Sequence, residues 1–329
     1  MRRLLARADR FLLLLIGTVA LAAVLPARGA AATWVDHGTT IAVALLFLLY
    51  GARLAPQAIW AGLANWRLQL LVFASTFALF PLIGIGVAAG TRAWLPAEVV
   101  TGLLYLCLLP STVQSSIAFT SIARGNVPAA LCSASLSNLV GVVLTPLLVA
   151  HLLTSAGGGL SLDAVRDIAV QILLPFVVGQ AIRPWAQGWL LAHPTLTSVV
   201  DRGSVLVVVY AAFGAGVVAG LWTQLSPLTL LAILLLSLVI LAIVLAATTL
   251  AARALRFPLA DEIATVFCGS KKSMASGIPM AAILFPAHSV GLIVLPLMIF
   301  HQVQLFVCAA LARRYAVDPR HAPASSTPA

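Results

Sequence analysis

The apolar run over residues 263–285 is interrupted near its centre by Gly-Ser-Lys-Lys-Ser at residues 269–273. A charged side chain at the centre of a bilayer costs about 2.5–3.5 kcal/mol on insertion scales, so two adjacent lysines there need partners, water or a function. A second interruption, Pro-Ser-Thr-Val-Gln-Ser-Ser at residues 110–116, splits the apolar stretch over residues 99–123. Paired broken helices, one in each half of a membrane chain, indicate the binding site of a secondary transporter.

The composition excludes a soluble protein, because 62% of the 329 residues are hydrophobic and only 9% are charged. Apolar stretches of roughly 17–25 residues, bounded by Arg, Pro, Gly or polar turns, each predict one membrane-spanning helix. We therefore predict an all-α multi-pass membrane protein with ten transmembrane helices, of which the fourth and ninth are broken and cross. The predicted spans are residues 10–26, 38–55, 67–90, 97–123, 127–153, 165–183, 198–221, 227–252, 260–286 and 288–312.

The distribution of arginine predicts the orientation of these spans. If both termini lie in the cytoplasm, the segments on that side hold most of the 19 basic residues, as the positive-inside rule requires of a cell-membrane protein. The net charge of +10 is then mainly a topology signal. Nucleic-acid binding would need a basic face on a folded domain, and no polar segment between the spans is long enough to form one.

Five spans on each side of a polar linker predict two repeats of opposite orientation, because an odd number of spans inverts the second half relative to the first. We assign residues 1–153 to the first repeat, 154–164 to the linker, 165–315 to the inverted second repeat and 316–329 to a disordered cytoplasmic tail. An alternative interpretation makes residues 1–32 a cleaved secretory signal peptide. That alternative leaves nine spans and does not reverse any later helix.

The sequence offers no catalytic or metal-binding constellation. The four cysteines lie in apolar spans without the CxxC spacing of metal or redox sites, and the six histidines are scattered. All nine acidic residues lie at or beyond the ends of predicted spans. We therefore expect neither an enzyme nor a cofactor or metal site, although an intramembrane enzyme remains the second alternative to a carrier.

Two segments carry a resemblance to a known family. Residues 110–126 read Pro-Ser-Thr-Val-Gln-Ser-Ser-Ile-Ala-Phe-Thr-Ser-Ile-Ala-Arg-Gly-Asn, and residues 267–279 hold Gly-Ser-Lys-Lys-Ser followed by Ser-Gly-Ile-Pro. Together with ten spans, they resemble the bile acid:sodium symporter family up to about Tyr315, most closely its divergent branch with a Lys-Ser motif in the ninth helix. The resemblance implies a core domain of spans 3–5 and 8–10 and a panel domain of spans 1, 2, 6 and 7. It further implies that an amphipathic organic anion binds between them.

This chain departs from that family at the coupling ion. The resemblance implies an acidic residue on the ninth helix beside two sodium ions, whereas here the same stretch holds lysines, whose ammonium groups have no oxygen to offer a cation. Sodium coupling is therefore in doubt. One lysine can instead act as a permanent structural cation while the other reaches toward water, which is the interpretation we favour. The alternatives are proton coupling, because burial disfavours a charged amine, and a direct contact with an anionic substrate.

These arguments predict a secondary transporter of a small organic anion that works by alternating access, coupled to protons or uncoupled rather than coupled to sodium. The alternative is a membrane regulator or sensor that keeps the carrier fold without transport. Of the two lysines, we expect Lys271 to lie inside the crossing, because small residues precede it. Asn138 and Gln302 are costly to expose to lipid, which favours the bundle interior for both. The candidate substrate- and ion-binding residues are Gln114, Ser115, Ser116, Asn138, Ser270, Lys271, Lys272, Ser273, His301 and Gln302.

Overall fold

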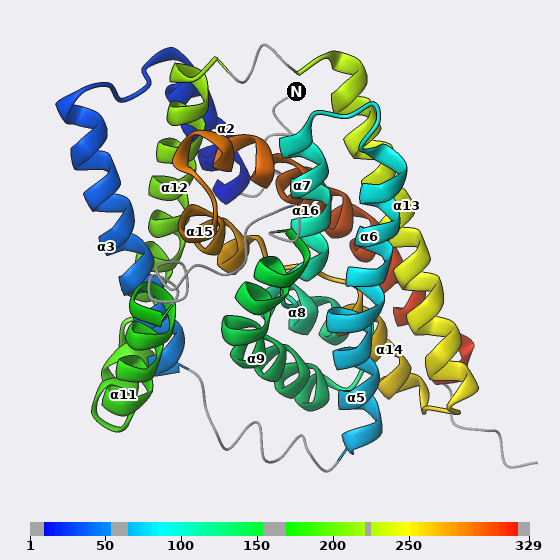
Figure 1. Cartoon of the computed structure of the whole chain (residues 1–329). Coiled ribbons are helices and arrows are strands. Elements are labelled where there is room, and N and C mark those ends of the chain that lie inside the picture. The colour runs from blue at the N-terminus through cyan, green and yellow to red at the C-terminus, as the bar shows by residue number, and fades with distance from the viewer. Residues whose placement is uncertain (1–9, 54–64, 154–168, 221–224, 322–329) are drawn as a thin grey trace, which may run out of the picture.

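A computed structural model describes residues 10–53, 65–153, 169–220 and 225–321. The described residues are almost entirely helical and contain no β-strand (Figure 1). Six helices are long and apolar enough to cross a membrane, which makes the chain a multi-pass membrane protein. The elements are α2 (Arg10–Val24), α3 (Ala30–Arg53), α5 (Trp66–Ala74), η2 (Ser75–Leu79), α6 (Phe80–Thr91), α7 (Ala97–Leu108), α8 (Gln114–Ile122), α9 (Val127–Leu153), η3 (Ala169–Leu173), α11 (Leu174–Ala192), α12 (Pro194–Val218), α13 (Pro227–Ala254), α14 (Leu259–Gly269), α15 (Met274–Leu284), α16 (Ala287–Ala316) and η5 (Pro319–His321).

Most predicted spans agree with these helices to within a few residues, but two boundaries were wrong. Helix α3 begins at Ala30, eight residues before the predicted start, because the three alanines that open it are strong helix formers. Helix α11 continues past the predicted end at residue 183 to Ala192, with Pro184 inside it. The predicted linker at residues 154–164 lies outside the described residues.

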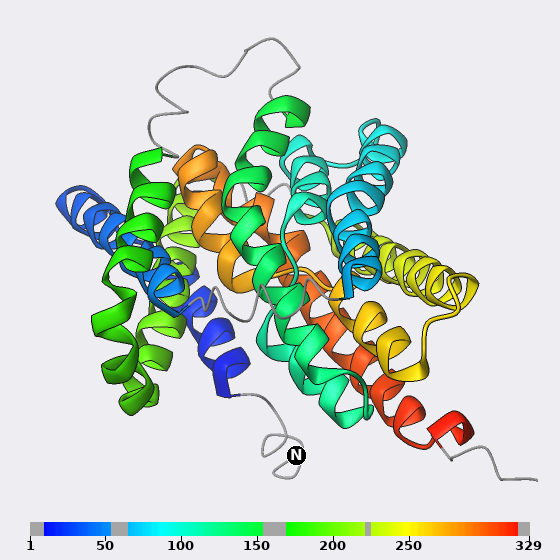
Figure 2. The same cartoon turned by 90° about the horizontal axis from the view of Figure 1, so that it is seen from below.

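The helices form two groups that lie side by side. Helix α3 packs against α11 and α12, and α12 also packs against α2, so these four helices form one group. In Figures 1 and 2 they lie on the left, and α13 lies on the far side of the second group. The backbones of α3 and α11 touch where glycines face each other, because a Cβ on Gly51 would meet the carbonyl of Phe176 and one on Gly179 that of Leu48. Small residues of this kind allow membrane helices to approach closely.

The second group contains the two predicted breaks, and both are confirmed. Helix α7 ends at Leu108, where Leu109 adopts an extended conformation before Pro110, and α8 begins at Gln114. Helix α14 ends at Gly269 and α15 begins at Met274, with the hydroxyl of Ser273 accepting a hydrogen bond from the backbone of Ser276 as an N-cap.

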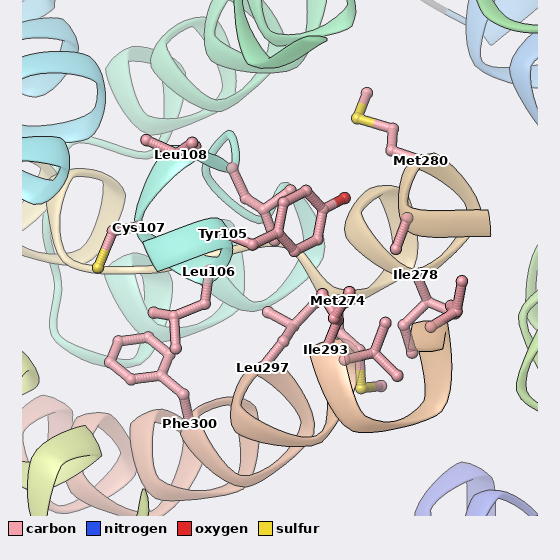
Figure 3. Packing of buried hydrophobic residues seen from close by; sticks show 14 of the residues in the cluster. Tyr105, Leu106, Cys107, Leu108, Met274, Ile278, Met280, Ile293, Leu297 and Phe300 are labelled. Atoms are coloured by element: carbon pink, nitrogen blue, oxygen red, sulfur yellow. The ribbon is translucent and has the colours of Figure 1, made fainter. Parts of the chain in front are cut away.

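Buried side chains from α7, α15 and α16 pack into an apolar core next to these breaks (Figure 3). Tyr105 of α7 lies among them and donates a hydrogen bond of 2.7 Å from its hydroxyl to the carbonyl oxygen of Gly277 in α15. A Cβ on Gly277 would lie 2.5 Å from Leu109 Cδ1 and 2.8 Å from Leu297 Cδ2, so these leucine side chains would have to shift to admit a larger residue where α15 passes the end of α7. The core therefore holds the two broken helices against each other.

The chain keeps a defined structure beyond α16, although we expected disorder from residue 316. Arg320 pairs with Glu262 of α14 at 2.9 Å and with Asp318 at 2.8 Å. Its hydrogen bonds hold the pKa of Asp318 at about 2. Glu262 is 1% exposed, pairs with Arg253 at 3.1 Å and accepts a hydrogen bond of 2.9 Å from the hydroxyl of Tyr315. This carboxylate at the start of α14 therefore connects the ends of α13 and α16 and the turn η5. Residues 322–329 of the predicted tail lie outside the described residues.

Candidate functional site

The two breaks lie against each other and share hydrogen bonds. The backbone N–H of Ser273, after the second break, donates to the carbonyl oxygen of Pro110 in the first, at 2.9 Å. The hydroxyl of Ser111 donates to the carbonyl of Cys268 at 2.6 Å. Four helix ends therefore meet inside the second group, and each brings backbone groups that lack a partner within its own helix.

The ammonium group of Lys272 donates hydrogen bonds to carbonyl oxygens at the end of α7. It donates to the carbonyl oxygens of Cys107 at 3.0 Å, Leu109 at 2.6 Å and Thr76 at 2.9 Å, which uses all three of its N–H bonds. The nitrogen also lies 4.0 Å from the centre of the Phe80 ring, and the side chain is fully buried. A positive charge at the C-terminal end of a helix is favoured by the helix dipole, so Lys272 both hydrogen-bonds and neutralises this end.

Lys271 lies in a different environment on the other side of the segment. Its ammonium group donates to the carbonyl oxygen of Ser115 at 2.8 Å and lies over the ring of Phe119, 3.8 Å from its centre. Lys271 is also fully buried. Lys271 thus lies inside the crossing, as we expected, but the expectation that the other lysine reaches toward water was wrong, because Lys272 is fully buried as well. Residues 270–273 are not helical, so the angle of about 100° between adjacent side chains of a helix does not apply to the two lysines, and both can be buried.

The end of α14 is satisfied by hydroxyl groups. Each of its last four carbonyl oxygens accepts one serine hydroxyl: Val266 from Ser270, Phe267 from Ser116, Cys268 from Ser111 and Gly269 from Ser75, over 2.6–3.1 Å. These are the four carbonyls that a helix leaves without internal partners. Three of the four donors come from the first half of the chain.

Asn138 holds the first break in place from α9. Its side-chain amide donates to the carbonyl oxygen of Ser111 at 2.7 Å and to that of Ala134 at 2.9 Å. The neighbouring Ser137 hydroxyl accepts from the backbone N–H of Ser111 at 2.9 Å. The segment between α7 and α8 is thus fixed by side chains of the following helix.

A cavity of about 460 Å³ lies between the two groups of helices and borders both breaks. Its other wall carries Tyr50, Arg53, Asp201 and Arg202; the Tyr50 hydroxyl donates to Asp201 at 3.2 Å, and Arg53 lies 3.9 Å from the same carboxylate. Five of the predicted site residues line this cavity: Gln114, Ser115, Asn138, Ser273 and His301.

The other predicted site residues divide into two sets. Ser116, Ser270, Lys271 and Lys272 are buried at the crossing behind the cavity wall. Gln302 is half-buried and belongs to neither the cavity wall nor the crossing contacts described above. Nine of the ten predicted residues therefore lie at or next to the two breaks: five line the cavity and four are buried behind its wall.

Gln304, one helical turn after His301, makes the contacts that we expected of an amide on this helix. Its side-chain oxygen accepts from the backbone N–H of Lys272 at 3.0 Å, and its nitrogen donates to the carbonyl of Lys272 at 3.0 Å. The same nitrogen lies 2.9 Å from Nδ1 of His301. The sequence shows both glutamines in an apolar helix, but only the three-residue spacing, which puts Gln304 on the face of His301, distinguishes them.

Ser75 and Thr76 were not predicted to belong to the site. They lie in η2, a π-helical turn between α5 and α6 in which the N–H of Phe80 bonds the carbonyl of Ser75. Such turns leave backbone groups without their regular partners and often occur at functional sites. Here the turn coincides with the Thr76 carbonyl that binds Lys272, and nothing in the sequence of this stretch indicates the turn.

Comparison with known proteins identifies relatives along almost the whole chain. The model of the SBF-like CPA transporter family matches residues 9–317. "Uncharacterized protein PA2026" of Pseudomonas aeruginosa is 53% identical and "Putative symporter YfeH" of Escherichia coli is 51% identical; the matches cover 94% and 93% of this chain and 93% and 92% of the relatives. "Sodium/bile acid cotransporter 7" of Rattus norvegicus is 26% identical over 82% of this chain and 81% of that protein.

The matches confirm the resemblance seen in the two broken segments. They also place the chain among membrane transporters rather than enzymes, because the family is one of transporters and two of these relatives are named as a symporter and a cotransporter. The chain therefore belongs to the SBF-like CPA transporter family.

Proposed function

We propose that this transporter moves a small organic anion by alternating access between its two groups of helices. The observation that carries the proposal is the cavity, which lies between the groups and borders both broken helices. Sites of secondary transporters lie at such positions, where discontinuous helices present backbone groups to a ligand. Rocking of α2, α3, α11 and α12 against the other group would expose the cavity to each side in turn.

The lining of the cavity supports an amphipathic anion as substrate. Arg53 and Arg202 lie on the wall formed by α3 and α12, and only one carboxylate, Asp201, lies among the described lining residues. Phe47, Phe176 and other apolar side chains supply the rest of that wall. Sites of this kind fix a ligand with a few polar groups and bind its body through apolar contact.

We further propose ten transmembrane helices in two inverted repeats, residues 1–153 and 165–315, with both termini in the cytoplasm of a cell membrane. In support, each broken pair, α7–α8 and α14–α15, is followed by one long helix, α9 and α16 respectively. The arginine distribution supports the orientation.

Sodium is not the coupling ion in this proposal. The ammonium group of Lys272 donates to three carbonyl oxygens at the crossing, so those oxygens already bind a positive charge. The coupling is therefore to protons or absent. A regulator that keeps the fold without transport is the alternative, but the names of the relatives do not favour it.

A two-step experiment tests the proposal. A thermal-shift screen of organic carboxylates and sulfonates identifies ligands, because a ligand that binds the folded state raises its unfolding temperature. Uptake of the best ligand is then measured in vesicles that contain the purified protein. We expect saturable uptake that Arg202→Gln weakens and that Arg92→Gln, an exposed arginine at the end of α6, leaves unchanged. Ligand binding without uptake would instead support a sensor.

A further inference from the structure

We propose that His301 is the proton-binding group of the cavity and that its protonation loosens the crossing of the two broken helices through Gln304. This inference deepens the proposed function, because it assigns the coupling proton to a residue and gives its route to the crossing. It rests on hydrogen-bond geometry around one side-chain amide. His301 lines the cavity, whereas Gln304 is fully buried behind it.

The orientation of the Gln304 amide is fixed by the backbone of Lys272. The N–H of Lys272 can only donate, so it must face the side-chain oxygen of Gln304, and the carbonyl of Lys272 can only accept, so it must face the nitrogen. Both bonds are 3.0 Å long. Rotating the amide by half a turn would set donor against donor and acceptor against acceptor. The identity of each atom in this amide therefore follows from its partners.

The fixed amide in turn determines the protonation of His301. The Gln304 nitrogen has two hydrogens, of which one goes to the carbonyl of Lys272 and the other to Nδ1 of His301, 2.9 Å away. Nδ1 must then accept, so His301 is neutral and carries its hydrogen on Nε2. An imidazolium ion has hydrogens on both nitrogens and would place an N–H against the amide N–H. Protonation thus requires either the ring or the Gln304 amide to move.

The charged groups around the cavity make this protonation depend on the substrate. Four cations disfavour a positive charge on His301. Two of them, Lys271 and Lys272, lie between α14 and α15 on the side of the crossing, and the other two, Arg53 of α3 and Arg202 of α12, lie across the cavity. Asp201 of α12 favours this charge and is shared with Arg53 and Tyr50. The described lining residues of α8, α9 and α15 are uncharged. An anion in the cavity favours the imidazolium ion, so anion and proton bind together.

Protonation of His301 affects the ends of α7 and α14 through Lys272. If Gln304 releases the backbone of Lys272, the segment between α14 and α15 loses two of the bonds that hold it, while the same residue's ammonium group still binds the end of α7. Binding of an anion and a proton is thereby linked to the stability of the crossing. Such a link between a ligand and the relative stability of two conformations is what coupled transport requires.

Nitrogen NMR of the full-length protein, labelled with ¹⁵N-histidine, tests the inference without a substrate. Subtracting the spectrum of His301→Gln isolates the signals of His301. At pH 7 we expect Nδ1 without hydrogen and Nε2 with it. Gln304→Glu replaces the amide nitrogen by a carboxylate oxygen, which loses the bond to the Lys272 carbonyl but can accept a hydrogen from Nδ1 of His301. The Nδ1 signal should then move to the protonated range at the same pH. A wild-type Nδ1 that carries hydrogen, or one that Gln304→Glu leaves unprotonated, overturns the inference.

A second measurement follows the crossing itself. Hydrogen exchange of the Lys272 amide, corrected for its intrinsic pH dependence, should quicken at least several-fold in the wild type when the pH falls from 7 to 5. His301→Gln should lose this acceleration, and His288→Gln, an exposed histidine on the same helix, should keep it. Equal acceleration in all three proteins overturns the link. Failure of the reconstituted protein to move any anion would overturn the proposed function while leaving both of these results in place.

Discussion

The ends of α7 and α14 meet at one crossing, yet their carbonyl groups are satisfied in different ways. At the end of α7 a single ammonium group, that of Lys272, binds two carbonyls of this end and one from η2, and the hydroxyl of Thr145 binds a third carbonyl, that of Leu108. At the end of α14 four neutral hydroxyls each bind one carbonyl. The carbonyl groups at the end of α7 are thus hydrogen-bonded mainly by one charged residue, whereas those at the end of α14 are hydrogen-bonded by four serines.

The difference teaches where a cation is needed in this fold. Hydroxyl donors satisfy the hydrogen bonds of the α14 end, and the ammonium group of Lys271 lies 5.5 Å from the centre of the Phe267 ring in its last turn but donates to Ser115 instead. At α7, Lys272 supplies both the hydrogen bonds and the charge. A lysine fixed to the chain keeps its ammonium group at this place without binding an ion from solution. We infer that Lys272 replaces a dissociable cation at the crossing, and the following predictions test how unequal the two ends are.

The largest effect is expected for Lys272→Met. Methionine has a similar length but no donor, so three buried carbonyls would lose their partner, at about 1–3 kcal/mol for each. The free energy of unfolding should fall by more than about 3 kcal/mol, measured by thermal unfolding in detergent, and uptake should be lost. Lys272→Arg should also fail, because a guanidinium is larger than an ammonium and its planar fork does not match three converging oxygens.

Lys271→Met is expected to have a smaller effect. Lys271 donates to one carbonyl, that of Ser115, and its contact with the Phe119 ring adds about 0.5–2 kcal/mol. The unfolding temperature should fall clearly less than in Lys272→Met under the same conditions. If Lys271→Met were the more damaging change, the assignment of Lys272 to the end of α7 would have to be reversed.

The serines of the α14 end should each contribute little. Ser75→Ala, Ser111→Ala and Ser116→Ala each remove one hydroxyl donor, so each should lower the free energy of unfolding by about 1–2 kcal/mol. Thr145→Val removes the corresponding hydroxyl at the α7 end and serves as the matched control. A loss at any single serine as large as that of Lys272→Met would show that the α14 end does not share its task among several donors.

Much of the crossing was predictable because its residues break an expected pattern. Two lysines and eight polar or proline residues inside apolar runs indicate both breaks from the sequence alone. The assignment of roles within the second break was not predictable, because it depends on the non-helical path of residues 270–273. The contribution of Ser75 and Thr76 depends on a π-helical turn, and that of Gln304 on a contact between residues 32 positions apart. Such features follow from packing rather than from local sequence.

The most direct test of the central claim is the effect of sodium on the unfolding temperature of the wild-type protein, with choline replacing sodium at constant ionic strength. If the ammonium group of Lys272 already occupies the carbonyl oxygens at the crossing, the unfolding temperature should not change across the sodium series, and uptake of an identified anion should not change either. A ligand of the folded state raises this temperature in a saturable way. A saturable rise with sodium, absent with choline, would show that other oxygens bind sodium and would contradict the account.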